Sequence, residues 1–305
     1  MDTRFAWLAG CGWAGIFGLS FLVTKSALEA FTPFQILFLR FALATAVLGL
    51  LAAIGVTKLR YRGKPKGILA LTCLFQPILY FLFETYGVRD TATSTAGLIL
   101  GAMPAAVAAL AVPLLKERLS APRAAGLLLS VGGVALVTVA GGSDGSDSPR
   151  GMALVGLALA CASFYNIYSR KASAWYGPAE ITFAMMASGA AVFGLLALVE
   201  RAAGGPPLAA RLSPGAVGAI AYLGLLSSVL AFFLVNLTLS RLKAAQSAVF
   251  GALVPAISLA AGALLRGESV GAAKLLGAAA ILAGLWATNA PERKYDMSCR
   301  GEVIE

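Results

Sequence analysis

Long apolar stretches separated by short polar segments fill almost the whole 305-residue chain. Each stretch holds about 20 residues, the length that an α-helix needs to cross the roughly 30 Å hydrocarbon layer of a bilayer. The ten stretches cover residues 5–27, 33–55, 66–88, 92–115, 121–140, 151–173, 177–199, 213–238, 243–265 and 270–289. The pattern therefore predicts an all-α integral membrane protein with ten transmembrane helices and no soluble domain.

The composition supports this prediction. Hydrophobic residues make up 59% of the chain and charged residues 12%, against about 25% charged residues in soluble domains. The 34 glycines are typical of helices that pack closely in lipid, where small residues let two backbones approach. The four cysteines form no Cys-x-x-Cys motif, and we expect them to be buried or idle thiols. They are Cys11, Cys73, Cys161 and Cys299.

The net charge of +10 is distributed unevenly along the chain. When the N-terminus is placed in the cytoplasm and the chain crosses ten times, most of the 24 lysines and arginines fall in cytoplasmic segments, notably 58–66 and 116–123. This bias follows the positive-inside rule. It predicts that both termini lie in the cytoplasm, and it gives no support for a nucleic-acid partner. We expect the protein to be a multi-pass protein of the cell membrane, specifically a bacterial inner membrane.

A run of turn-forming residues at 141–150 divides the apolar stretches into two sets of five that match each other at a fixed offset of 151 positions. The matched pairs include Pro104 and Pro255, Glu117 and Glu268, Gly126 and Gly277, Gly133 and Gly284, and Phe81 and Phe232. Because five is odd, a second copy enters the membrane from the opposite face, which is the inverted repeat of many secondary transporters. We expect a first repeat at 5–140, an outer linker at 141–150, a second repeat at 151–289 and a cytoplasmic tail at 290–305.

Several of these segments resemble the EamA family of the drug/metabolite transporter superfamily. The resemblance rests on the segment Trp13–Lys25, Pro33 followed by Leu39-Arg40-Phe41, Pro104 followed by Leu114–Leu119, Gly126 and Gly132-Gly133-Val134, and the repeated pattern Leu265-Arg266-Gly267-Glu268 with Gly277. The second half departs from the first, because Met185 and Met186 lie near the position that matches Arg40. The resemblance implies a ten-helix transporter of small metabolites, often amino acids and related compounds, and often directed outward.

Polar and aromatic residues at mid-span depth are the candidates for contact with a substrate, because uncompensated polarity is costly in lipid. The predicted substrate-binding residues are Trp13, Phe17, Gln76, Tyr80, Gly101, Tyr165, Asn166, Ser169, Asn236 and Ser247. Each has a structural alternative. The aromatic rings can serve packing, the amides can form helix–helix hydrogen bonds, and Gly101 can serve close helix packing.

Three charged residues within or beside the spans form a second group of candidates. Arg40 and Glu84 lie at similar depths from the outer ends of their stretches, and a buried arginine is expected to find a partner. We therefore expect an Arg40–Glu84 contact with Lys25 nearby. It would serve as a static ion pair that pins two helices, as an outer gate, or as a charge that meets a zwitterionic substrate. For Glu117 and Glu268 we expect a role in capping or orienting helix ends.

Absent residue types narrow the function. The chain has no histidine, which excludes a Ser-His-Asp triad, a histidine-based zinc site and a histidine proton relay. It also lacks a phosphate-binding P-loop, so we expect no cofactor, metal or ATP-driven step, and no enzymatic activity. The favoured function is a secondary transporter that exports amino acids or amino-acid-derived compounds by alternating access around a central cavity. An importer or exchanger, and a non-transporting membrane partner or sensor, are the alternatives; the sequence does not choose between a monomer and a homodimer.

Overall fold

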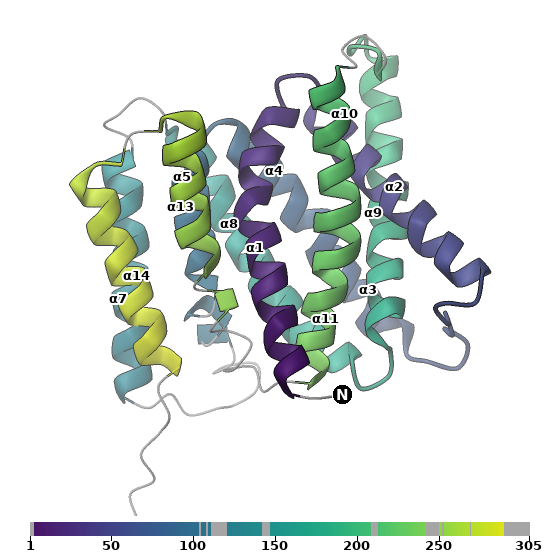
Figure 1. Cartoon of the computed structure of the whole chain (residues 1–305), viewed down its shortest axis with the longest axis horizontal. Helices are drawn as coiled ribbons and strands as arrows, with labels where there is room; N and C mark the ends of the chain where they lie inside the picture. The colour runs from purple at the N-terminus through teal and green to yellow at the C-terminus, as the bar shows by residue number, and fades with distance from the viewer. Residues whose placement is uncertain are drawn as a thin grey trace, which may run out of the picture.

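The computed structural model describes residues 3–103, 105–107, 109–110, 121–141, 147–208, 213–241, 250–251, 253–268 and 270–289. Within these ranges the chain forms a helical bundle and contains no β-strand (Figure 1). The helices are α1 (Thr3–Ala27), α2 (Pro33–Ala53), α3 (Lys66–Cys73), η1 (Leu74–Leu79), α4 (Tyr80–Arg89), α5 (Thr93–Gly101), α7 (Ala121–Gly141), α8 (Pro149–Ala172), α9 (Pro178–Ala202), α10 (Pro214–Ala221), η3 (Tyr222–Ala231), α11 (Phe232–Arg241), α13 (Leu253–Arg266) and α14 (Ala272–Asn289).

Among the described residues, six helical runs are long and apolar enough to cross a membrane. They are Leu8–Ala27, Pro33–Ala53, Lys66–Arg89, Pro149–Ala172, Pro178–Ala202 and Pro214–Thr238. Shorter apolar helices occupy Thr93–Val107, Ala124–Val137, Leu253–Arg266 and Ala272–Gly284. The all-α membrane class is therefore confirmed, whereas the count of ten helices, their inverted arrangement and the cytoplasmic termini stay predictions.

Local sequence signals set where several helices begin. The helices α2, α8, α9 and α10 each start with a proline, which costs no hydrogen bond because the first amides of a helix have no partner within it. Side chains of Thr32, Ser148 and Ser213 accept hydrogen bonds from the first turns of α2, α8 and α10. Such caps stabilise a helix start by about 1 kcal/mol each.

The run Lys66–Arg89 is broken near its middle, where η1 contains Pro77. The preceding residue, Gln76, has an extended backbone with φ −150° and ψ 119°. A proline inside a helix removes one hydrogen bond and clashes with the preceding turn, so the helix stops before Pro77 and resumes as α4. Interrupted membrane helices of this kind often flank substrate sites in transporters.

Helices of the N-terminal half pack mainly against helices of the C-terminal half. Along the left of Figure 1, α7 lies against α14 and α5 against α13, and toward the right α2 lies against α9. The remaining close neighbours are α4 with α8, and α1 with η3 and α11. The start of α1 and the end of α14 reach the same lower edge of the bundle in this view.

Glycines bring α7 and α14 into backbone contact. A Cβ atom built on Gly133 would lie 2.8 Å from the carbonyl oxygen of Gly277, and one built on Gly284 would lie 2.5 Å from that of Gly126. Between these contacts, the hydroxyl of Ser130 donates to the carbonyl of Ile281 at 3.4 Å. Only glycine permits this approach, since any side chain would fill the space that the neighbouring backbone occupies.

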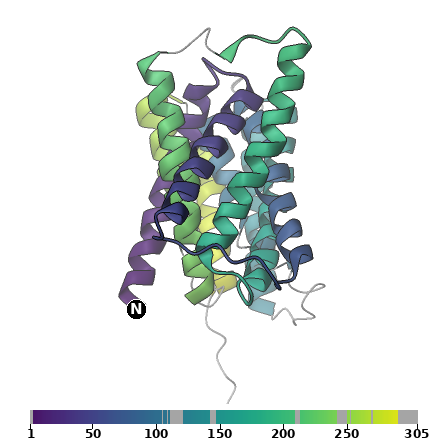
Figure 2. The ribbon, with the colours of Figure 1, turned by 90° about the vertical axis from the view of Figure 1, so that its right-hand side faces the viewer.

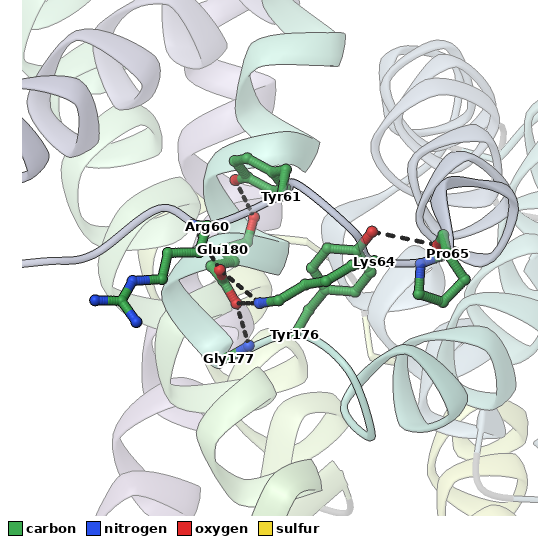
Figure 3. Close-up of polar contacts among 7 residues, drawn as sticks. All are labelled: Arg60, Tyr61, Lys64, Pro65, Tyr176, Gly177 and Glu180. Carbon is green, nitrogen blue, oxygen red and sulfur yellow. Dashed lines mark hydrogen bonds and ion pairs between the residues drawn. The ribbon is translucent and has the colours of Figure 1, made fainter.

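The segment after α2 crosses the lower edge of the bundle (Figure 2). Its residues form hydrogen bonds to the start of α9 (Figure 3). The Glu180 carboxylate accepts bonds from the Lys64 ammonium at 2.7 Å, the Arg60 amide at 2.7 Å and the Gly177 amide at 2.7 Å. The Tyr61 hydroxyl donates to the Glu180 carbonyl at 2.8 Å. One acidic residue thus joins the α2–α3 segment to α9.

The segment after α9 is fastened to the start of α2 in the corresponding way. The Gln35 amide donates to the Pro206 carbonyl at 2.8 Å, and the Thr32 hydroxyl donates to the Glu200 carboxylate at 2.6 Å. Gln35 and Glu180 both occupy the third position of their helices. The pair α2 and α9 is therefore tied at both ends.

Candidate functional site

Aromatic rings gather in the core where α1, α4, α8 and α11 meet. The ring of Phe232 lies 5.2 Å from that of Phe17, 5.9 Å from that of Phe81 and 6.3 Å from that of Tyr165, measured between centroids. All three contacts have tilted or edge-to-face geometry, the arrangement that aromatic quadrupoles favour. Phe81 and Phe232, which match at the 151-residue offset, thus meet at the centre of this cluster.

Two residues extend the aromatic cluster and bring polar groups with them. The Trp13 ring lies 5.9 Å from that of Phe17, and the Tyr80 ring lies 4.8 Å from that of Phe81. The indole N–H of Trp13 is fully buried and has no hydrogen-bond partner among the described residues. Buried N–H groups normally have a partner, so this group is available to an acceptor on a ligand.

Arg40 places a positive charge beside the aromatic cluster. Its side chain is 1% exposed, with Nε donating to Ser228 at 3.0 Å and Nη2 donating to Ser227 at 2.9 Å. The guanidinium carbon lies 4.3 Å from the centre of the Phe81 ring, within the range of a cation–π interaction. Both serines lie in η3, so this arginine links α2 to a helix of the second half.

The expected ion pair between Arg40 and Glu84 is not formed. No Arg40–Glu84 ion pair within 4.0 Å occurs in the described structure, and Glu84 accepts its hydrogen bond from Thr85 instead, at 3.1 Å. The guanidinium of Arg40 instead donates to hydroxyl groups of the second half. The spacing of residues within the first half could not predict these partners. The Lys25 ammonium donates to the Thr91 carbonyl, and its expected place near Arg40 and Glu84 stays a prediction.

Asn236 holds three helices together. Its side-chain oxygen accepts from the Tyr165 hydroxyl at 3.1 Å and from the Ser169 hydroxyl at 2.9 Å, and its amide donates to the Thr182 hydroxyl at 3.0 Å. Asn236 is fully buried. This geometry supports the helix–helix alternative for Tyr165, Ser169 and Asn236, while their contact with a substrate stays a prediction.

An Asn236→Leu variant is expected to lower the free energy of unfolding by about 2 kcal/mol, because buried hydroxyls without partners each cost about 1–3 kcal/mol in water-soluble proteins and less in membranes. Thermal unfolding in detergent measures the effect. Asn166→Leu is the matched control, since among the described residues the Asn166 amide bonds to the Ala162 carbonyl of its own helix and to the Met103 sulfur. An equal decrease in the free energy of unfolding in the two variants would contradict a special role for Asn236.

The structure places the remaining predicted residues as follows. Gln76 is buried at the break in the Lys66–Arg89 run, and its side chain forms no hydrogen bond to another described residue. Gly101 lies against Pro255, with 2.6 Å between a Cβ atom built on the glycine and the proline ring, which fits close packing. Ser247 and Glu117 lie outside the described residues.

A polar cluster forms at the N-terminal end of α5. The Glu268 carboxylate accepts bonds from the amides of Thr93 at 2.8 Å and Ser94 at 2.9 Å. Asp147 accepts from the Ala92 amide at 2.7 Å and pairs with the buried ammonium of Lys274 at 3.3 Å. Free amides and the helix dipole favour negative charge at this end, and the expected capping role of Glu268 is confirmed.

Sequence reasoning missed the Asp147–Lys274 pair, which is almost fully buried. The one available signal was a lysine, Lys274, within the last apolar stretch. Thr182 was also missed, since a lone threonine in an apolar helix gives no pattern. The described residues contain no group of three or more histidine, cysteine or acidic side chains placed to hold a metal.

Loss of the Glu268 carboxylate is expected to weaken the tie between α13 and α5. Burial alone would raise its pKa, but the bonds from Ser94 and Thr93 outweigh burial and lower the pKa below its ordinary value. A lowered pKa means that the stabilisation is complete above about pH 4.3, the value for an unfolded glutamate, and is lost as the pH falls through the folded value. We expect Glu268→Gln to reduce the Tm at pH 7 by several degrees, with the difference from wild type shrinking below about pH 4.

Glu29→Gln is the control for this experiment, because Glu29 forms an exposed pair with Arg266 at the same edge. Exposed pairs contribute about 0–1 kcal/mol. A Glu268→Gln deficit that stays constant down to pH 3 would show that its charge is not the cause.

A cavity of about 380 Å³ lies between α5, α13 and α14, away from the aromatic cluster. Its lining is formed by Leu98, Pro255, Ala256, Leu259, Ala260, Ala263, Val270, Ala278 and Leu282. These side chains offer no polar group to orient a ligand, so the cavity suits apolar groups such as lipid chains rather than a polar substrate.

Comparisons with known proteins place the chain among transporters. A model of the EamA-like transporter family matches residues 4–139 and again residues 149–290. The chain is 35% identical over 288 residues to the uncharacterized transporter YcxC of Bacillus subtilis, covering 93% of this chain and 92% of that protein. It is 27% identical over 252 residues to a protein of Streptantibioticus cattleyicolor named as a probable terminal-alkyne amino-acid exporter, covering 82% of each.

Two more distant likenesses agree in length and fold. An uncharacterized transporter of Archaeoglobus fulgidus is 24% identical over 270 residues, covering 88% of this chain and 93% of that protein. A solved crystal structure superposes with a TM-score of 0.68 at 21% identity and covers 94% of this chain and 96% of its own. That likeness concerns the fold alone.

Proposed function

Because the chain belongs to the EamA-like transporter family, we propose that it exports amino acids or amino-acid-derived compounds by alternating access. Membership of the family expected from the sequence is confirmed, and with it a multi-pass transporter of the bacterial cell membrane that acts on a small molecule, is surrounded by lipid and is not an enzyme. The substrate class, the direction and the mechanism below are the proposal.

The proposed architecture is ten helices in two inverted repeats, at 5–140 and 151–289, with an outer linker at 141–150 and both termini, including the tail at 290–305, in the cytoplasm. The pairing of helices supports it. When matching helices of the two halves swap places, the pairs α7–α14, α2–α9 and α5–α13 each remain the same pair. The contact of α4 with α8 becomes the contact of η3 and α11 with α1, which is also present. A two-fold relation between the halves accounts for all these contacts together.

Contacts between single residues support the same relation. At the offset of 151, Gly133 matches Gly284 and Gly126 matches Gly277, so the Gly133–Gly277 contact corresponds to the Gly284–Gly126 contact. The hydrogen bond between Ser130 and Ile281 joins two residues that match each other at this offset. A pair of mirrored halves can rock about a shared centre and open it to either side in turn. The family model also matches each half separately.

The proposal for the substrate rests on one observation, the Arg40 guanidinium beside aromatic rings at the interface of the halves. An arginine recognises a carboxylate through parallel hydrogen bonds, and the neighbouring rings suit an apolar or aromatic side chain. In the described structure Nη1 of Arg40 donates to no residue, which leaves it available to a substrate carboxylate. The name of the relative from Streptantibioticus cattleyicolor concerns the same substrate class.

The direct test compares the extracellular metabolites of cells with and without this protein, followed by transport in proteoliposomes. We expect accumulation of one or a few amino-acid-like compounds outside the producing cells. Tyr80→Ala and Asn166→Ala report on the site, and unchanged export in either variant would remove that residue from it. Uptake into cells without export, or no transport in proteoliposomes of either orientation, would contradict the proposal.

A further inference from the structure

Glu84 is a buried carboxylate that forms no ion pair with another described residue. Its side chain is 2% exposed, and its position five residues before Arg89 puts it about 7 Å from that end of the run. Its hydrogen bond comes from Thr85, and no lysine or arginine nitrogen lies within 4.0 Å of it in the described structure. An ionised carboxylate is very costly in such a place, whereas a carboxylic acid is not.

Few titratable groups from the surrounding helices face Glu84. Arg40 from α2 and Tyr80 from the first turn of α4 act on it. The neighbouring segments η1 and α5 contain no titratable residue. On α1 and α8, Lys25 donates to the Thr91 carbonyl and the Tyr165 hydroxyl donates to Asn236.

Arg40 has an alternative partner in Glu84. Phe81 and Glu84 are three residues apart on α4 and therefore lie on one face of that helix, and the guanidinium of Arg40 lies over the Phe81 ring. Its present partners, Ser227 and Ser228, belong to the second half. Movement of Arg40 from the two serines to Glu84 would replace a contact between the halves with a contact within the first half.

We propose that Glu84 is the proton-binding site of the transporter and that its protonation decides whether Arg40 ties the two halves together. We assign a neutral, protonated Glu84 to the state in which Arg40 bonds to the two serines, as in this structure. Loss of the proton to water leaves a carboxylate that attracts Arg40 and releases Ser227 and Ser228. Uptake of one proton from the opposite aqueous side restores the acid, so one proton crosses the membrane in each cycle.

This inference rests on the proposed function for its role in transport, but the protonation state is testable without a substrate. Infrared spectra of the full-length protein in lipid nanodiscs should contain a carboxylic-acid C=O band at pH 7 that disappears in Glu84→Gln. Glu180→Gln is the matched control, because Glu180 is 6% exposed but pairs with Lys64 at 2.7 Å. We expect no change of the acid band in that variant.

Glu84→Asp is a second variant that tests the proposal if Glu84→Gln does not fold. It keeps a titratable group, so it should shift the acid band rather than remove it. Absence of any acid band at pH 7 that depends on residue 84 would overturn the proposal. The proposed function can fail independently, because the spectra require no transport.

Transport itself gives the second measurement. Proteoliposomes that contain a pH-sensitive dye and receive a defined mixture of neutral L-amino acids should show proton movement with wild type and at least a tenfold slower movement with Glu84→Gln. Amino-acid transport at the wild-type rate without any proton movement would overturn the coupling while leaving the proposed function intact.

Discussion

An Arg40→Met variant is expected to reduce transport at least about 100-fold, which corresponds to about 2.7 kcal/mol of lost substrate binding. Methionine has similar length but neither charge nor donors, so it cannot hold a carboxylate. Its effect on folding should be small, because replacing a buried charge with an apolar side chain is often neutral or stabilising. Transport in proteoliposomes and Tm in detergent separate the two effects.

The double variant Ser227→Ala/Ser228→Ala gives the matched contrast. It keeps the Arg40 charge in the core but removes both hydroxyl partners, and a hydrogen bond to a charged group contributes about 1.5–3 kcal/mol. We therefore expect this variant to unfold at a lower temperature than Arg40→Met. Adding Arg40→Met to the double variant should raise its Tm again. A further decrease in Tm would contradict the assigned hydrogen bonds between Arg40 and the two serines.

Gly133→Ala is expected to destabilise the protein by about 1–3 kcal/mol, the range for a core that receives one carbon atom too many. The added Cβ would lie 2.8 Å from the Gly277 carbonyl oxygen and 2.9 Å from the Ile281 amide nitrogen. Both are backbone atoms, so α14 has to move as a whole. Thermal unfolding in detergent measures the loss.

Gly132→Ala is the control for this prediction, because a Cβ atom at Gly132 meets nothing within 4 Å. Alanine is favoured over glycine in a helix by about 0.5–1 kcal/mol, so this neighbouring change should be neutral or stabilising. Gly284→Ala tests the relation between the halves, since it should match Gly133→Ala in size. A harmless Gly133→Ala would show that α7 and α14 are not in backbone contact.

Much of the fold could be predicted because lipid imposes a strict requirement on the chain. Every backbone polar group in the lipid must be satisfied within a helix, so we expected the apolar stretches to be helical. Within the described residues they are, apart from the break at Gln76. The packing interpretation of Phe81 and Phe232 also agrees with the structure, in which their rings meet. Glu268 caps α5, as its place at a helix end predicts.

The candidate site was harder to predict because its partners lie on different halves. Spacing along one half placed Glu84 near Arg40, yet the partners of Arg40 are hydroxyls nearly 190 positions away. The cap of α5 combines Glu268 with Asp147, and the charge of Asp147 is balanced by Lys274. Periodicity reports which face of a helix is buried but not which helix covers it.

The fastened ends of α2 and α9 limit how such a carrier can move. Glu180 secures one end of this helix pair, and Gln35 with Thr32 secures the other. These contacts hold α2 and α9 against each other at both ends. Under the proposed alternating access, we therefore expect α2 and α9 to move together, while the other helices shift relative to this pair.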